Sequence, residues 1–214
     1  MLIKSSTILK MSLILITTLL SLGQATAVPS RPVPQAPRSP QALRVPQALI
    51  ARAQQVTGDS FPLTTTTPRG VTVLARTKPR VEVLRAIDQG FAELFAVALR
   101  HGYRNRLNYA DYTVFIGRPD RMRDSQGQYS PDIALPAAQY AGSYYDQGGF
   151  IYAAGMVLAF NPCAFVIAEH GRDFGRITNV VRYEGEHIVL YHNDRALYER
   201  TADHSRGGAH PILQ

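Results

Sequence analysis

Two residues near the C-terminus, Glu184 and His187, have the types and the spacing that proton transfer or metal binding requires. They lie in the stretch 177–194, where apolar residues recur at intervals of three and four and predict one buried face of a helix. Glu184 falls on that face, and a carboxylate in an apolar interior needs a metal, a cation or a proton-transfer role to offset its burial. Tyr183 lies four residues before His187, so the two rings can point the same way.

The elements that must position this helix predict an α+β domain. The segments 71–75 and 112–116 are rich in β-branched and aromatic residues and predict two strands. Between them, an apolar stripe at helical spacing stops near Gly102, which predicts a long helix starting near residue 81. Two or three further strands are expected between residues 139 and 170. We therefore expect a small mixed sheet with one long backing helix and a C-terminal helix that carries the site.

This order of elements, over residues 71–210, resembles the minimal catalytic core of the zincin metallopeptidases. The signature of that superfamily is His-Glu-x-x-His on a helix, and the corresponding residues here are Tyr183, Glu184, Gly185, Glu186 and His187. The glutamate and the second histidine match, whereas a tyrosine replaces the first histidine. In the complete motif both imidazoles bind zinc and a downstream residue adds a third ligand, while the glutamate accepts a proton from the water that the metal activates.

The resemblance implies a zinc-dependent peptidase with Glu184 as the general base, His187 as one zinc ligand, and His204 or His210 as the downstream ligand. Tyr183 stands in the place of the other ligand, and its phenol, with an ordinary pKa of about 10, binds zinc less readily at neutral pH than an imidazole. Three outcomes stay open. In the first, the ligand set is unusual and catalysis is weak. In the second, His187, His204 and His210 supply all three ligands, and in the third the site has lost its catalytic activity.

Two other functions compete with the peptidase. A secreted domain could keep the zincin-like architecture only to bind a partner, and one equivalent of bound zinc would argue against that alternative. More remotely, Asp203-His204 followed by Gly207-Gly208 resembles part of the motif of HNH endonucleases, which would suit a secreted, basic nuclease. Glu186 is expected to be solvated.

Composition limits the partners that this chain could bind. The net charge is +7, but scattered arginines supply it and no lysine-rich run occurs in the domain, so no specific nucleic-acid site is expected. The expected partner is a peptide or protein substrate, lying in extended form along a strand at 150–160. Cys163 is the only cysteine, which excludes an internal disulfide, and its apolar neighbours predict a buried thiol.

The N-terminal third is expected to lie outside the folded domain. Residues 1–27 combine two lysines, an apolar run of about 12 residues and a small-x-small site, which predicts a signal peptide and secretion to an extracellular or periplasmic space. That run is shorter than the roughly 20 residues of a membrane-spanning helix, and no later segment is long enough to span a bilayer. Residues 28–70 are rich in Pro, Arg and Thr and predict a disordered arm or linker, although a short helix is compatible with 48–56. The zincin-like domain is then residues 71–214.

Overall fold

The computed structural model describes residues 45–119, 122–123, 129–130, 133–136, 150–204 and 208–213. The predicted signal peptide, the first part of the predicted arm and the strand expected near residues 140–145 lie outside these ranges. All described residues belong to one compact unit. Among the helices of the described chain, none is long and apolar enough to cross a membrane.

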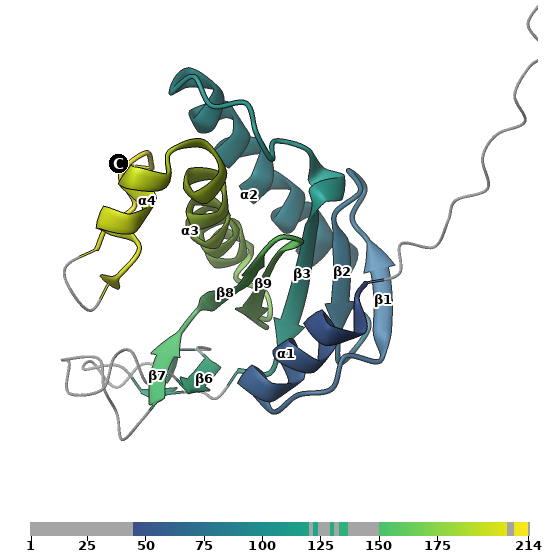
Figure 1. The fold of residues 1–214 in the computed structure, drawn as a ribbon. Helices are drawn as coiled ribbons and strands as arrows, with labels where there is room; N and C mark the ends of the chain where they lie inside the picture. The colour runs from purple at the N-terminus through teal and green to yellow at the C-terminus, as the bar shows by residue number, and fades with distance from the viewer. Residues whose placement is uncertain are drawn as a thin grey trace, which may run out of the picture. The chain divides into compact units, whose positions relative to one another are not determined.

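A mixed five-stranded sheet forms the centre of the domain (Figure 1). Its order is β1 (Leu63–Thr66), β2 (Thr72–Ala75), β3 (Tyr112–Gly117), β9 (Cys163–Ala168) and β8 (Gly155–Phe160). The three central strands are parallel, whereas the edge strands β1 and β8 run antiparallel to their neighbours. Two small antiparallel pairs accompany the sheet, β4 (Met122–Arg123) with β5 (Tyr129–Ser130), and β6 (Ile133–Pro136) with β7 (Phe150–Ala153). The predicted α+β class with a small mixed sheet is confirmed.

The central strands are buried at every position and mostly apolar, because helices cover both faces of the sheet. In β3, Val114 and Ile116 face one core cluster, whereas Phe115 between them faces the other. The same alternation in β9 sends Phe165 to the first cluster and Val166 to the second. All of these side chains are buried, so the continuous apolar runs in the sequence record a sheet enclosed from both sides.

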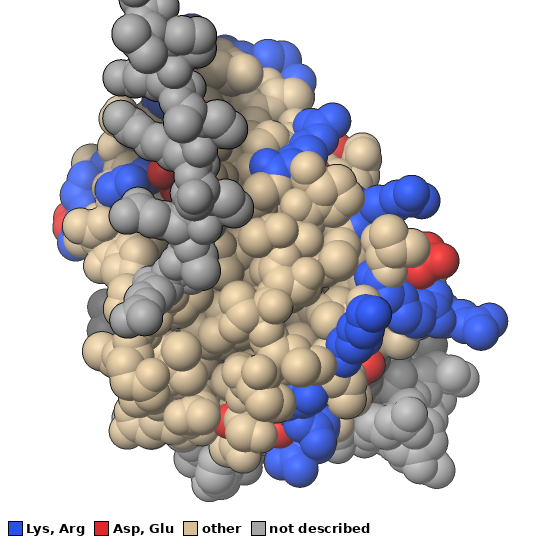
Figure 2. Space-filling model, turned by 90° about the vertical axis from the view of Figure 1, so that its right-hand side faces the viewer, with Lys and Arg blue, Asp and Glu red and all other residues tan. Residues whose placement is uncertain are grey.

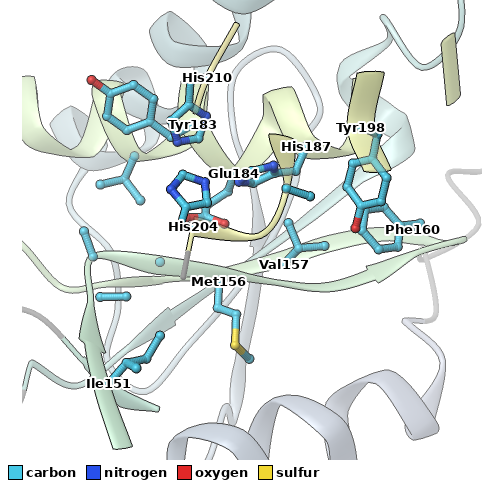
Figure 3. Close-up of a pocket in the computed structure, with 15 residues that line it drawn as sticks. Ile151, Met156, Val157, Phe160, Tyr183, Glu184, His187, Tyr198, His204 and His210 are labelled. Carbon is cyan, nitrogen blue, oxygen red and sulfur yellow. The ribbon is translucent and has the colours of Figure 1, made fainter. Parts of the chain in front are cut away.

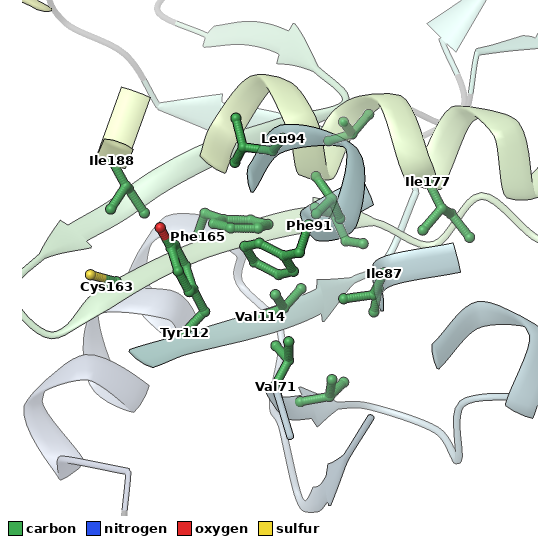
Figure 4. Packing of buried hydrophobic residues seen from close by; sticks show 14 of the residues in the cluster. Val71, Ile87, Phe91, Leu94, Tyr112, Val114, Cys163, Phe165, Ile177 and Ile188 are labelled. Atoms are coloured by element: carbon green, nitrogen blue, oxygen red, sulfur yellow. The ribbon is translucent and has the colours of Figure 1, made fainter. Parts of the chain in front are cut away.

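The two long helices cover one face of the sheet, α2 (Val81–Arg100) and α3 (Phe174–Asn193), and the shorter α1 (Gln47–Thr57) covers the other (Figure 1). Figure 4 shows the core between the long helices and the sheet, with Phe91 from α2 lying against Tyr112 and Phe165 from the strands. The backing helix and the C-terminal helix therefore form as the sequence predicted. Helix α2 ends at Arg100, two residues before Gly102.

Two glycines let α2 and α3 cross at close range. A Cβ added at Gly90 of α2 would lie 2.7 Å from both the carbonyl oxygen of Thr178 and the Cβ of Val181 in α3. A Cβ at Gly185 of α3 would lie 2.5 Å from the terminal Cδ2 of Leu94 in α2. The backbones approach because neither position carries a side chain, and this crossing fixes the rotation of α3 about its axis.

The folded domain begins earlier than the predicted boundary at residue 71. Helix α1 buries Leu49, Ala53 and Val56 against the second face of the sheet, and Phe61 packs edge-on against Phe115. Strand β1 then pairs with β2 along its whole length. The prediction of a disordered arm is therefore wrong for residues 45–70, because these residues cover a sheet face that would otherwise expose large side chains to water.

Basic side chains are spread over the surface of the domain. On the face that Figure 2 shows, most Lys and Arg side chains lie along one side and acidic ones lie between them, while the centre carries neither kind.

The remaining helical elements are the 3₁₀ turn η1 (Tyr109–Asp111), which precedes β3, and α4 (Arg195–Thr201), which follows α3. A single residue, Asp194, caps α4 by accepting a hydrogen bond from the N–H of Leu197 at 2.9 Å.

Candidate functional site

Strand β8 and helix α3 form opposite walls of a cavity of about 470 Å³, which the segment after α4 borders (Figure 3). Gly155, the first residue of β8, makes the close approach possible, because a Cβ there would lie 2.9 Å from Cγ of Glu184. Glu184 and His187 both line the cavity from α3. Tyr183 lines the cavity as well, so the expectation from the sequence that Tyr183, Glu184 and His187 face a common cleft is consistent with the geometry.

Three histidines converge at this cavity, His187 from α3 and His204 and His210 from the segment after α4 (Figure 3). Their ring centroids are 4.9 to 5.3 Å apart, and one nitrogen from each lies within 4.8 Å of the others. In a tetrahedral zinc site with Zn–N bonds of about 2.0–2.1 Å, the ligand nitrogens lie roughly 3.4 Å apart. Small side-chain movements would therefore bring all three onto one ion.

The environment of His187 and His204 favours the neutral imidazole, which is the form that binds a metal. Burial, together with the smaller effect of the nearby rings of His210 and His204, lowers the pKa of His187 to about 3. Burial also lowers the pKa of His204, and Nε2 of that ring is enclosed without a hydrogen bond to any described group. A buried nitrogen with an unused lone pair or proton is costly in a protein interior. A cation bound between the three rings would use that nitrogen, so these residues fit a metal ion.

Glu186 supports the third histidine from the opposite side. It is fully buried, its Oε2 accepts a hydrogen bond from Nδ1 of His210 at 2.6 Å, and its Oε1 accepts one from the N–H of Ile212 at 2.8 Å. The expectation that Glu186 is solvated was wrong. The spacing of apolar residues in α3 places Glu186 on the polar side of the helix. The C-terminal segment packs over that side and buries the carboxyl group.

Tyr183 does not join the three histidines. Its ring stacks on that of His210 with centroids 4.5 Å apart and an angle of 28° between the planes. The side chain is 41% exposed, and Figure 3 shows its hydroxyl pointing away from the cluster. The predicted role of Tyr183 as a ligand is therefore not supported by its position, and of the three outcomes left open by the sequence, the set of His187, His204 and His210 matches the geometry.

Glu184 is the acid that faces the cavity. Burial raises the pKa of Glu184 from 4.5 to about 8, and a hydrogen bond from the backbone of Val157 in β8 lowers it by less. Without a bound cation the carboxyl is therefore largely protonated at neutral pH. A cation among the three histidines would favour the carboxylate and lower this pKa, which leaves a group able to accept and return a proton.

The rest of the cavity is mainly apolar. Its lining includes Ile151 from β7 and Met156 from β8. The aromatic rings of Phe160 and Tyr198 also line it, with centroids 5.2 Å apart. In the described part of the chain, β8 pairs only with β9 in the sheet, so no described strand pairs with its outer edge. Tyr198 and Val157 escaped the sequence analysis, because single apolar or aromatic residues carry no signal of which cavity they line.

No family model, curated protein or solved structure matches this chain.

Proposed function

We propose that this protein is a zinc-dependent hydrolase that cleaves peptide bonds. The observation that carries the proposal is the convergence of three histidines beside a protonatable carboxyl, in one cavity of the described chain. His187, His204 and His210 hold the metal, and three imidazoles leave one tetrahedral position open, as in catalytic rather than structural zinc sites. Zinc supplies a Lewis acid and an activated water when it is bound there.

Glu184 is the general base of this proposal. A carboxyl within the same cavity as the histidines can take a proton at the start of hydrolysis and give it to the leaving amine. The backbone of Val157 donates a hydrogen bond to it, which orients the carboxylate and keeps it from turning out of the cavity. The buried surroundings that raise the pKa of Glu184 also bring it nearer to the working pH, where proton transfer in both directions is efficient.

Peptides are the substrate class that the walls of the cavity favour. The outer edge of β8 offers backbone N–H and C=O groups beside the histidines, and an extended peptide can add to such an edge as a further strand. The apolar lining near Ile151, Met156 and Phe160 suits an uncharged side chain of that peptide. This deepens the sequence-based expectation of a strand at 150–160, because residues of both β7 (Phe150–Ala153) and β8 (Gly155–Phe160) line the cavity.

The test combines metal content with hydrolysis. The purified protein should bind one zinc per chain by elemental analysis and cleave peptides from a mixed library, and chelation should stop the cleavage. Glu184→Gln should keep zinc while it lowers the cleavage rate by roughly 10²- to 10⁴-fold, because an amide cannot accept the proton. His187→Ala should lose both zinc and cleavage.

Two results would count against this proposal. A protein that stays free of zinc under saturating conditions would contradict the metal site. A protein that binds zinc but cleaves no peptide, whether or not Glu184 is present, would favour the binding domain without catalytic activity.

A further inference from the structure

The segment of residues 208–213 is attached to α3 through one carboxylate. Both oxygens of Glu186 accept hydrogen bonds, and both donors, His210 and Ile212, belong to this segment. The carboxylate is fully buried, so water cannot replace either donor. A buried carboxyl group is costly when it loses its hydrogen-bond partners, which ties the position of the segment to Glu186.

The same contacts orient the ring of His210. A carboxylate oxygen only accepts, so Nδ1 of His210 donates to Glu186 at 2.6 Å, and in a neutral imidazole Nε2 then keeps the lone pair. The stacked ring of Tyr183 restrains the imidazole plane. Nε2 is then the nitrogen left to face His187 and His204, and histidines that bind metals commonly donate their other N–H to a carboxylate in this manner.

We infer that Glu186 is the positioning residue of the metal site, and that docking of residues 208–213 on Glu186 and binding of the metal reinforce each other. This rests on the proposed function, since it takes His210 as a metal ligand. The α3 helix alone provides one of the three histidines, and the other two arrive with the chain after α4. Whatever holds residues 208–213 on α3 therefore decides whether the ligand set is complete.

Glu186→Gln tests the inference with a small change of shape. A glutamine side chain has one acceptor oxygen, so it can satisfy His210 or Ile212 but not both, and its NH₂ group faces the donor that remains. We expect zinc affinity, measured by competition with a chromophoric chelator, to fall about 10- to 100-fold. Glu199→Gln is the matched control, because Glu199 is exposed and forms an ion pair with Arg195 within α4; its zinc affinity should equal that of the unchanged protein.

Two measurements can be made on the unchanged chain, so they do not depend on whether a variant folds. Long-range ¹H–¹⁵N correlation spectra of the metal-free protein should show the proton of His210 on Nδ1. Hydrogen exchange should show the amide of Ile212 protected, and more strongly so once zinc is added. In Glu186→Gln the protection by zinc should be weaker.

The outcomes separate this inference from the proposed function. If the unchanged protein binds zinc but the proton of His210 is on Nε2, or Glu186→Gln binds zinc as tightly as Glu199→Gln, the positioning role is overturned and the zinc site stands. If the unchanged protein binds no zinc, both proposals fail. An Nδ1 proton together with a selective loss of affinity in Glu186→Gln supports the inference.

Discussion

At the scale of single residues, three neighbouring positions of α3 have different surroundings. Tyr183 is exposed and stacks on a ring, Glu184 faces a cavity, and Glu186 is enclosed by the chain that follows α4. Since successive residues of a helix point about 100° apart, three different environments can meet one turn of helix. The two acids of this turn therefore differ in role: Glu184 is the candidate base, and Glu186 the support of His210.

The position of Tyr183 predicts the effect of its replacement by histidine. In Tyr183→His, a shorter ring at the same place would still face the ring of His210 rather than the nitrogens of the cluster, so zinc affinity should change less than about threefold. His204→Ala should lower it far more, because it removes one of three ligands. Zinc titration of both variants checks this, and a gain of about tenfold or more in Tyr183→His would restore position 183 to the ligand set.

The pKa of Glu184 predicts how the stability of the metal-free protein depends on pH. Burial raises this pKa from 4.5 to about 8, so the folded chain holds the proton more tightly than the unfolded chain. The resulting stabilisation is complete below pH 4.5 and is lost as the pH rises towards 8. Glu184→Gln cannot ionise, and its free energy of unfolding relative to the unchanged protein should therefore increase between pH 5 and pH 8.

Urea denaturation in the presence of a chelator would measure that difference. One unit of pKa shift corresponds to about 1.4 kcal/mol, so the effect should exceed experimental error. The lowered pKa of His187 acts in the opposite direction, with stability lost as the pH falls below 6.5. Because both proteins contain His187, its contribution cancels. A constant difference from pH 5 to pH 8 would show that the carboxyl of Glu184 is not buried in solution.

At the scale of elements, the crossing of α2 and α3 aims the site at β8. Gly90 and Gly185 permit the close approach from opposite helices, but their neighbours differ. A methyl group at Gly90 meets a backbone carbonyl and a Cβ, neither of which can move without shifting α3. A methyl group at Gly185 meets the end of the Leu94 side chain, which can rotate away.

This contrast predicts unequal costs for the same substitution. Gly90→Ala should lower the free energy of unfolding by about 1–3 kcal/mol, as overpacking of a rigid contact does. Gly185→Ala should change it by less than about 1 kcal/mol, because the higher helix propensity of alanine offsets the rearrangement of Leu94. Thermal or urea unfolding of the two variants gives the comparison, and equal losses would mean that the helices separate easily at both positions.

At the scale of the whole molecule, α1 and β1 complete the domain on the side away from the site. Helix α1 covers Leu74, Phe115 and Val166 on the second face of the sheet. Residues 45–70 contain no candidate site residue, so their contribution to function is through stability. The buried Asp59 strengthens the attachment, since it pairs with Arg76 at 3.2 Å and accepts a hydrogen bond from the N–H of Arg118 at 2.6 Å.

A chain that begins at residue 45 should therefore fold, and one that begins at residue 71 should not fold stably. Removing α1 and Phe61 strips four buried side chains from the second core, and each large one contributes about 2–5 kcal/mol when deleted. Circular dichroism during urea denaturation of the two shortened chains tests the boundary. Limited proteolysis that yields a stable fragment starting near residue 71 would contradict it.

Much of the fold was determined by local sequence patterns. The stripe of Ile87, Phe91 and Leu94 predicted α2, the apolar runs predicted β3 and β9, and the spacing around Val180 predicted α3. These patterns are readable because burial on one or both faces imposes a period on neighbouring residues. Glu184, His187, His204 and His210 were proposed as candidate site residues from the sequence, and the structure brings the three histidines together. β1 was missed because its run of threonines is mostly exposed and lacks apolar alternation.

Only the tertiary structure decided which of these residues meet. Whether Tyr183 or His204 stands beside His187 depends on the path of the chain after α4, and no periodicity within α3 records that path. Glu186 became a buried support because residues 208–213 return to α3, and the second core formed because α1 folds back on the sheet. A sequence pattern reports burial by the element's own neighbours along the chain, whereas contacts between distant segments follow from how the whole chain closes its surface against water.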